Sequence, residues 1–173
     1  WLSLQLRSEL NQRLPGYSVS LPTEAQWERA ARAKDVISAD ERQYPWDDHK
    51  SKKVHLHANI SASGLKRVSP VGLFAPNPLG LCDLSGNVLE WQNNLYLPDG
   101  SGQHTGLGLD VTQMKTHDDW DKAGCPALRG GSWGSTADLA RSSIRNGARP
   151  DGWYDDVGFR VVLSLAASQN PET

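Results

Sequence analysis

The sequence is poor in sulfur, in long apolar runs and in net charge. Its 173 residues include two Cys and one Met. Cys82 and Cys125 form neither a disulfide framework nor a metal quartet, and we expect small apolar fillers or, alternatively, a single disulfide. No apolar run approaches the roughly 18 residues of a membrane span. The net charge of -2 and the pI near 6.2 argue against a dedicated nucleic-acid binder.

Glycine, proline and tryptophan are abundant instead. The chain has 16 Gly and 10 Pro, and its aromatic residues are 7 Trp, 4 Tyr and 2 Phe. This composition favours a loop-rich fold with irregular packing over a helical bundle. The hydrophobic fraction of 38% argues against disorder, and the length suits one domain.

Local patterns predict a few short elements. Thr23-Glu24-Ala25-Gln26 is a capping box, which predicts a helix from about Glu24 to Lys34. Alternation or apolar runs predict short strands at His55–His57 and at Val71–Phe74, and a buried strand over Gly158–Leu163.

One carboxylate lies inside an apolar run. Glu90 interrupts Val88–Trp91, and a buried carboxylate needs a partner. Side-chain oxygens of Asp83 and Glu90, with the backbone carbonyls of Gly86 and Val88, can form an oxygen shell suited to Ca²⁺. The alternative is a salt bridge between Glu90 and an Arg.

Seven motifs occur in an order that resembles the formylglycine-generating-enzyme (sulfatase-modifying-factor) family. They are Leu21-Pro22-Thr23-Glu24-Ala25-Gln26-Trp27-Glu28, Tyr44-Pro45-Trp46, Pro70-Val71-Gly72, Gly80-Leu81, Gly86-Asn87-Val88-Leu89-Glu90-Trp91, Arg129-Gly130-Gly131-Ser132-Trp133 and Gly158-Phe159-Arg160. The resemblance covers Trp1 to about Leu165 and only the C-terminal part of the usual family domain. We therefore expect residues 1–173 to be a single domain that is truncated at its N-terminus.

The resemblance implies an α+β fold of the irregular C-type-lectin-like kind, with few helices, short antiparallel strands and much loop. It also implies structural Ca²⁺ and no organic cofactor. The family has two calcium sites. The first is matched by Asp83, Gly86, Val88 and Glu90, and the second is matched in part by Asn59 and the carbonyl of Ile60.

The family's oxidase chemistry is not expected here. That chemistry needs two cysteines in the segment after the Gly-Gly-Ser-aromatic motif, and Gly134–Ala140 contains none. The related sulfoxide synthases of thiohistidine biosynthesis need an added iron-binding helical domain with a His triad, which this chain does not contain. The sequence therefore predicts a non-catalytic domain.

Residues 134–157 resemble the variable region of the proteins that diversity-generating retroelements diversify. There, mutated adenines turn Asn codons into others, but never into those of Glu, Lys, Gln or Met. Residues 134–157 contain none of these four types, where composition leads one to expect about three. An ordinary loop rich in Gly, Asp and Ser is the alternative. All candidate ligand-binding residues except Trp153 can be reached from an Asn template codon, and Trp153 needs another template codon. The candidates are Gly134, Ser135, Thr136, Asp138, Ile144, Gly147, Ala148, Gly152, Trp153, Tyr154, Asp155 and Asp156.

Aromatic and small polar residues together are typical of a paratope. The sequence thus predicts a domain that binds a ligand, expected to be a protein surface, on a scaffold stiffened by buried Trp, Arg129, Arg160 and calcium. A fixed regulatory or sensing module is the alternative, and an enzyme using Cys125 is the third hypothesis. A prokaryotic origin is expected, and a cytoplasmic location is favoured.

Overall fold

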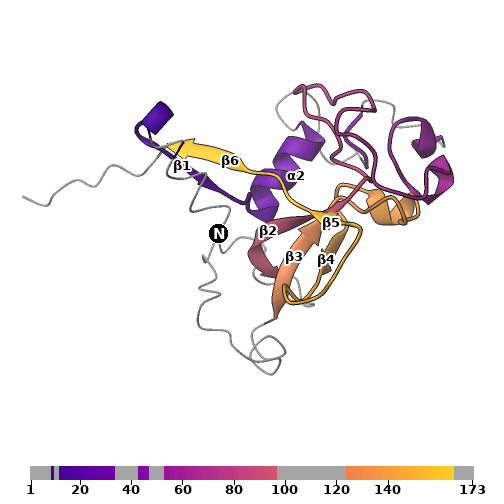
Figure 1. The fold of residues 1–173 in the computed structure, drawn as a ribbon. Coiled ribbons are helices and arrows are strands. Elements are labelled where there is room, and N and C mark those ends of the chain that lie inside the picture. Colours follow the sequence, from indigo (N-terminus) through magenta and orange to yellow (C-terminus); the bar gives the residue numbers. More distant parts are fainter. Residues whose placement is uncertain (1–8, 10–11, 34–42, 47–52, 97–123, 166–173) are drawn as a thin grey trace, which may run out of the picture.

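The computed structural model describes residues 9, 12–33, 43–46, 53–96 and 124–165. In these ranges, helices are few and strands are short (Figure 1). The elements are β1 (Tyr17–Ser20), α2 (Glu24–Arg32), the 3₁₀ helices η1 (Val54–Leu56) and η2 (Ser61–Ser63), β2 (Leu89–Tyr96), β3 (Cys125–Arg129), the 3₁₀ helix η4 (Asp138–Ala140), β4 (Arg145–Gly147), β5 (Val157–Gly158) and β6 (Val162–Leu165).

Two small sheets organise the described residues. The larger sheet has the order β4-β3-β2-β5, with antiparallel pairs except for the parallel pair β2–β5. The smaller sheet pairs β1 with β6 in antiparallel fashion. Helix α2 packs on β2 and β3, and Figure 1 shows β6 running from β5 past this helix to β1. The fold is thus the α+β arrangement expected from the sequence.

Helix α2 begins where the capping box predicts. The Gln26 amide donates to Thr23 Oγ1 at 3.2 Å, and the Thr23 amide donates to Gln26 Oε1 at 2.9 Å. The helix ends at Arg32, two residues earlier than expected, because Ala33 adopts a left-handed conformation with φ of 47°. Its buried residues Glu24, Trp27 and Ala31 face the sheet.

The strand predictions were less successful. His55–His57 is not a strand but overlaps η1, and Leu56 is 60% exposed. Val71–Phe74 forms turns rather than a strand. The segment Gly158–Leu163 is divided between β5 and β6, and Leu163 is 50% exposed rather than buried. In each case the apolar or alternating run has the local pattern of a strand, but the tertiary structure does not pair it as one continuous strand.

The apolar core is small and divided. One cluster contains Trp27, Ala31 and Leu84, and a second joins Val54, Ala58, Ile60 and Ala140. Much of the remaining interior is polar. The buried polar residues are Glu24, Asn59, Ser69, Asn77, Ser85, Asn87, Glu90, Gln92, Asn94, Arg129, Ser132 and Ser142.

Charged hydrogen bonds fill the space between α2 and the larger sheet. Arg129 on β3 is 0% exposed and donates to Glu24 Oε2 at 3.3 Å, to Glu28 Oε2 at 2.5 Å and to the Ser142 carbonyl at 2.8 Å. Arg145 on β4 donates to both oxygens of Glu24, at 2.7 and 2.8 Å. Burial lowers the pKa of Arg129, while the nearby carboxylates of Glu28 and Glu24 oppose that shift. These ion pairs fasten α2 to two strands.

We predict that Glu24→Gln lowers the free energy of unfolding by about 3 kcal/mol, because it leaves buried Arg129 with less compensating charge. Urea unfolding of the purified chain measures this change. The matched control is Asp151→Asn, which removes an exposed carboxylate 3.8 Å from the partly exposed Arg149 and is expected to cost no more than about 0.5 kcal/mol. Equal losses in both variants would contradict the assigned role of Glu24.

Candidate functional site

The twelve candidate ligand-binding residues lie on the surface. None of them is buried. Those classed as exposed are Gly134, Thr136, Asp138, Gly152, Trp153, Tyr154 and Asp155, and those of intermediate exposure are Ser135, Ile144, Gly147, Ala148 and Asp156. Between or beside them, Ser132, Ala140 and Ser142 are buried. Burial thus marks three constant positions next to the candidates, while other non-candidate residues of the region, such as Asn146, Pro150 and Asp151, are exposed.

The candidates fall into two stretches of chain. The first leads into η4, and the second runs through β4 and the following loop to β5. In Figure 1, η4 lies beside one end of the larger sheet, while the loop after β4 extends along the sheet toward its other end. The sheet thus carries both stretches, and we treat them as two parts of one candidate surface, residues 134–157.

The loop between β4 and β5 presents two aromatic residues in different ways. Trp153 is 100% exposed, whereas Tyr154 is 43% exposed. The Tyr154 hydroxyl donates to the Arg149 carbonyl at 3.1 Å, and its ring meets Trp91 edge-on with centroids 6.4 Å apart. Tyr154 is therefore held by the scaffold, while the Trp153 side chain is available in full to a partner.

The stretch before η4 is fixed by hydrogen bonds of Ser135. The Ser135 hydroxyl accepts from the Ser132 amide at 2.9 Å, and the Ser135 carbonyl accepts from the Ser61 amide at 2.9 Å. Ser135 is consequently engaged in structure, whereas the neighbouring Gly134, Thr136 and Asp138 are exposed. Leu139, 53% exposed, was missed by the sequence analysis although its codons also fit an Asn template.

Three candidate glycines differ in the space around them. A Cβ at Gly134 would meet only Ser132 Oγ, at an ordinary 3.8 Å. At Gly152 it would collide with the Tyr154 hydroxyl, so a side chain there would displace the Tyr154 ring. At Gly147 it would lie 2.7 Å from Tyr96 Cβ, an atom close to the backbone of β2. The structure therefore argues against side-chain variation at Gly147.

Glu90 has an arginine partner, which was the alternative to calcium. Arg160 donates from Nε to Glu90 Oε2 at 2.6 Å and from Nη2 to Oε1 at 2.5 Å. The Trp27 indole adds a 2.6 Å hydrogen bond to Oε2. Burial acts to lower the pKa of Arg160, but the hydrogen bond and charge of Glu90 outweigh it, so that the pKa is raised. The predicted salt bridge is confirmed.

The other residues matched to calcium are also engaged. Asp83 Oδ2 accepts from the Gly72 amide at 2.7 Å. Gly86 has a φ of 75°, and any Cβ there would collide with the Asn59 carbonyl. Asn59 Nδ2 donates to the Arg67 carbonyl, and its Oδ1 accepts from Ser63.

Ile60 and Val88 were expected to contribute backbone carbonyls, and their side chains are used in packing. Ile60 packs in an apolar cluster, and the Val88 side chain packs against Gly158. Among the described residues no group of three His, Cys, Asp or Glu is placed to hold a metal. Calcium therefore stays a prediction.

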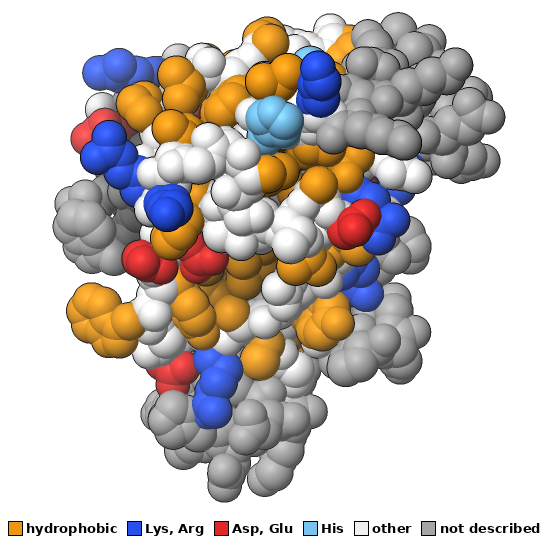
Figure 2. All heavy atoms as spheres, turned by 90° about the vertical axis from the view of Figure 1, so that its right-hand side faces the viewer, with side chains coloured by type: hydrophobic (Ala, Val, Ile, Leu, Met, Phe, Trp, Pro, Cys, Tyr) orange, Lys and Arg blue, Asp and Glu red, His pale blue; other side chains and the backbone are white. Residues whose placement is uncertain are grey.

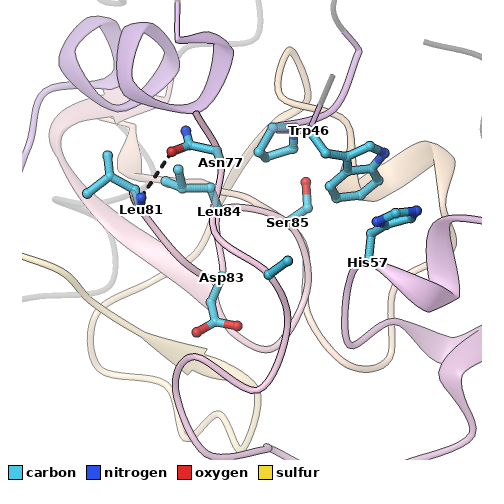
Figure 3. A pocket seen from close by; sticks show the side chains of 9 residues that line it. Trp46, His57, Asn77, Leu81, Asp83, Leu84 and Ser85 are labelled. Carbon is cyan, nitrogen blue, oxygen red and sulfur yellow. Dashed lines mark hydrogen bonds between the residues drawn. The ribbon is translucent and has the colours of Figure 1, made fainter. Parts of the chain in front are cut away.

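A small cavity lies beside η1. Its volume is about 10 Å³, which is about enough for one water molecule. Figure 3 shows Trp46 and His57 on one side, Asn77 and Leu81 on the other, and Ser85 between them. It is lined by Pro45, Trp46, His57, Ala75, Asn77, Leu81, Asp83, Leu84 and Ser85. This cavity is too small for an organic ligand.

The described chain defines a class: an α+β scaffold with a polar core that displays loop residues on one sheet. The sequence profile of the Sulfatase-modifying factor enzyme 1-like domain matches residues 1–165. The protein therefore belongs to the sulfatase-modifying-factor family, as the motifs predicted. No disulfide joins Cys82 and Cys125.

Relatives of the chain carry both inactive and enzymatic names. It is 32% identical over 157 residues to the inactive C-alpha-formylglycine-generating enzyme 2 of Mus musculus, covering 83% of this chain and 42% of that protein. It is 33% identical over 150 residues to the hercynine oxygenase of Mycolicibacterium thermoresistibile, covering 84% of this chain and 32% of that protein. The chain thus spans less than half the length of these relatives, one mammalian and one bacterial.

Solved structures confirm the fold. The Treponema denticola variable protein 1 matches with a TM-score of 0.63 and 24% identity over 86% of this chain and 48% of that one. PvdO from Pseudomonas aeruginosa matches with a TM-score of 0.63 and 30% identity over 91% of this chain and 56% of that one.

The helices among the described residues are too short or too polar to span a membrane.

We predict that Glu90→Gln lowers the melting temperature by about 6–12 °C, because it breaks a buried ion pair. The loss should be the same in EGTA and in CaCl₂, and EGTA should leave the unmodified chain unchanged. Differential scanning calorimetry in both buffers provides the measurement. A calcium-dependent rise in the unmodified chain that disappears in Asp83→Asn would restore the calcium interpretation.

Proposed function

We propose that this chain is a non-catalytic ligand-binding domain whose surface of residues 134–157 contacts a protein partner. The observation that carries the proposal is the fully exposed Trp153 on a loop whose neighbour, Tyr154, is fixed by Arg149 and Trp91. An exposed indole on a supported loop is a costly feature without a partner and an effective anchor with one.

Charge suggests what the partner presents. The turn after Ala148 contains Arg149, Asp151, Asp155 and Asp156, with a formal sum of -2 from one positive and three negative charges. Asp151 and Asp155 are exposed. Carboxylates beside an indole favour a partner with Lys or Arg around an apolar contact, through charge pairing and cation–π contact.

Diversification of this surface is part of the proposal. Exposed candidates alternate with buried Ser132, Ala140 and Ser142, which is the pattern that a varied surface on a constant scaffold requires. The Treponema denticola variable protein 1 supports only the fold, because its sequence is 24% identical to this chain. Gly147 is removed from the proposed variable set because of Tyr96, and Leu139 is added because it is exposed.

Lack of catalysis also belongs to the proposal. It rests on the absence of Cys from Gly134–Ala140 and on relatives that are named inactive. Other relatives are named formylglycine-generating enzymes. Cys125 lies at the start of β3, opposite Tyr96, and not in the 134–140 segment. A fixed regulatory or sensing module would use the same surface without codon variation.

We predict that sequencing this gene across its source population shows codon changes at positions such as 134, 136, 138, 139 and 155, at adenines of a nearby near-repeat. Codons 132, 142 and 147 should stay constant, because Ser132 and Ser142 are buried and Gly147 faces Tyr96. Deep sequencing of the 3′ end of the gene measures both. Invariant codons with no near-repeat would replace diversification with the fixed-module alternative.

We predict that Gly147→Tyr lowers the free energy of unfolding by about 1–3 kcal/mol through overpacking against Tyr96, whereas Gly134→Tyr changes it by less than about 0.5 kcal/mol. The same residue introduced at two partly exposed glycines makes the pair a matched comparison. Chemical denaturation of both variants gives the two values. Equal tolerance at both positions would return Gly147 to the variable set.

A further inference from the structure

We propose that residues 65–81 form a second docking surface, separate from residues 134–157, which takes an acidic protein segment with aliphatic anchors. This 65–81 loop contains no helix or strand. It nevertheless carries six large aliphatic side chains that are exposed to solvent: Leu65 at 40%, Val68 at 46%, Val71 at 86%, Leu73 at 56%, Leu79 at 50% and Leu81 at 37%. So many in one segment exceed the scattered apolar residues of an ordinary surface.

These side chains face outward because the backbone of the loop is fixed from within. At its start, the Arg67 carbonyl accepts from Asn59 Nδ2 at 2.9 Å, and the Ser69 amide donates to Asn87 Oδ1 at 2.9 Å. Asn59 and Asn87 are almost fully buried, at 1% and 3% exposure. The first part of the loop is thus held by amides of the interior.

The middle and end of the loop are fixed in the same way. The Gly72 amide donates to Asp83 Oδ2 at 2.7 Å, between the two most exposed aliphatic residues, Val71 and Leu73. Asn77 Oδ1 accepts from the amides of Leu79 and Leu81, both at 3.0 Å, and its Nδ2 donates to the Ala30 carbonyl at 2.8 Å. A surface ordered before binding loses little conformational entropy when a partner arrives.

The charge of the loop indicates the kind of partner. Lys66 and Arg67 are exposed, and the sequence has no Asp or Glu between residues 65 and 82. Asp83 follows, with one carboxylate oxygen used by Gly72. Figure 2 views the side of the molecule that lies on the right in Figure 1. Over its upper part it shows hydrophobic side chains with Lys and Arg, and also Asp or Glu, beside them. Positive charge at the rim of an apolar face complements Asp and Glu.

An acidic protein segment fits these observations better than a membrane. Recruitment by anionic lipid typically takes clusters of four to eight Lys or Arg, whereas this loop has two. A peptide of alternating aliphatic and acidic residues would use the aliphatic side chains as anchors and Lys66 and Arg67 for register. This surface does not depend on the proposed function of residues 134–157, because the two share no residue.

The experiment selects short random displayed peptides on the purified chain and then measures their affinities by biolayer interferometry. We expect enriched peptides to combine Leu, Ile or Val with Asp or Glu. Val71→Asp with Leu73→Asp should weaken binding roughly tenfold or more, and Lys66→Glu with Arg67→Glu should remove the preference for acidic peptides. These side chains are exposed, so we expect the variants to keep the melting temperature of the unmodified chain.

Two control variants test whether the loss of binding is specific to the 65–81 loop. Leu165→Asp introduces the same charge at another exposed aliphatic residue, 74% exposed on β6, and should leave peptide binding unchanged. Trp153→Ala should also leave it unchanged, so failure of the proposed function would not affect this result. Enrichment without acidic residues, or peptides that still bind the Val71→Asp/Leu73→Asp variant, would overturn the proposal.

Two further outcomes would assign the loop to another occupant and equally overturn the proposal. One is a dimer in light scattering that Val71→Asp abolishes, which identifies a second copy of the chain. The other is sedimentation with phosphatidylserine vesicles that Val71→Asp abolishes, which identifies a membrane.

Discussion

The structure depends on carboxylates of the interior that bind arginines far away in the sequence. Glu24 on α2 holds Arg129 and Arg145, and Glu90 on β2 holds Arg160. Trp27 joins the two groups, since its indole donates to Glu90 while Arg129 lies over its ring at 5.2 Å. A buried charge is tolerable only when its partner is present in good geometry. The strands β3 and β4 are thereby fixed to α2, and the segment between β5 and β6 is fixed to β2.

In the part of the chain that the structure describes, this arrangement explains how small apolar clusters support much loop. The two apolar clusters hold only a few side chains, and several of these are Ala. Directional hydrogen bonds take over the task of specifying backbone positions, as Asn59, Asn77 and Asn87 do for the 65–81 loop. Loops fixed by interior amides and carboxylates need no apolar side chains of their own to stay ordered. Those side chains can point outward and remain available for binding.

Sequence reasoning succeeded where one local rule decides the structure. The capping box set the start of α2, and an unpaired carboxylate in an apolar run correctly required a partner for Glu90. It failed where burial comes from distant residues. No feature of the Val71–Phe74 sequence indicates that Asp83 holds Gly72 in a turn, which leaves Val71 exposed to solvent. Likewise, the full burial of Arg129 follows from two carboxylates about a hundred residues away. The twelve candidate residues came from the resemblance to a variable region and not from codon reachability alone, because Ala140 and Ser142 also fit Asn codons and are buried.

The β4 strand shows how a surface can be separated from its scaffold. Arg145 reaches inward to Glu24 and stacks over Tyr96 at 5.3 Å, while Gly147 leaves room for the same Tyr96 ring. Both residues are thus committed to α2 and β2, and the strand cannot change without loss of that packing. Beyond Gly147 the chain leaves the sheet, and the Trp153 side chain is fully exposed and does not take part in this packing. The boundary between constant and changeable positions therefore lies within a few residues along one strand. It is set by whether a residue contacts the buried ion pairs or packs against Tyr96.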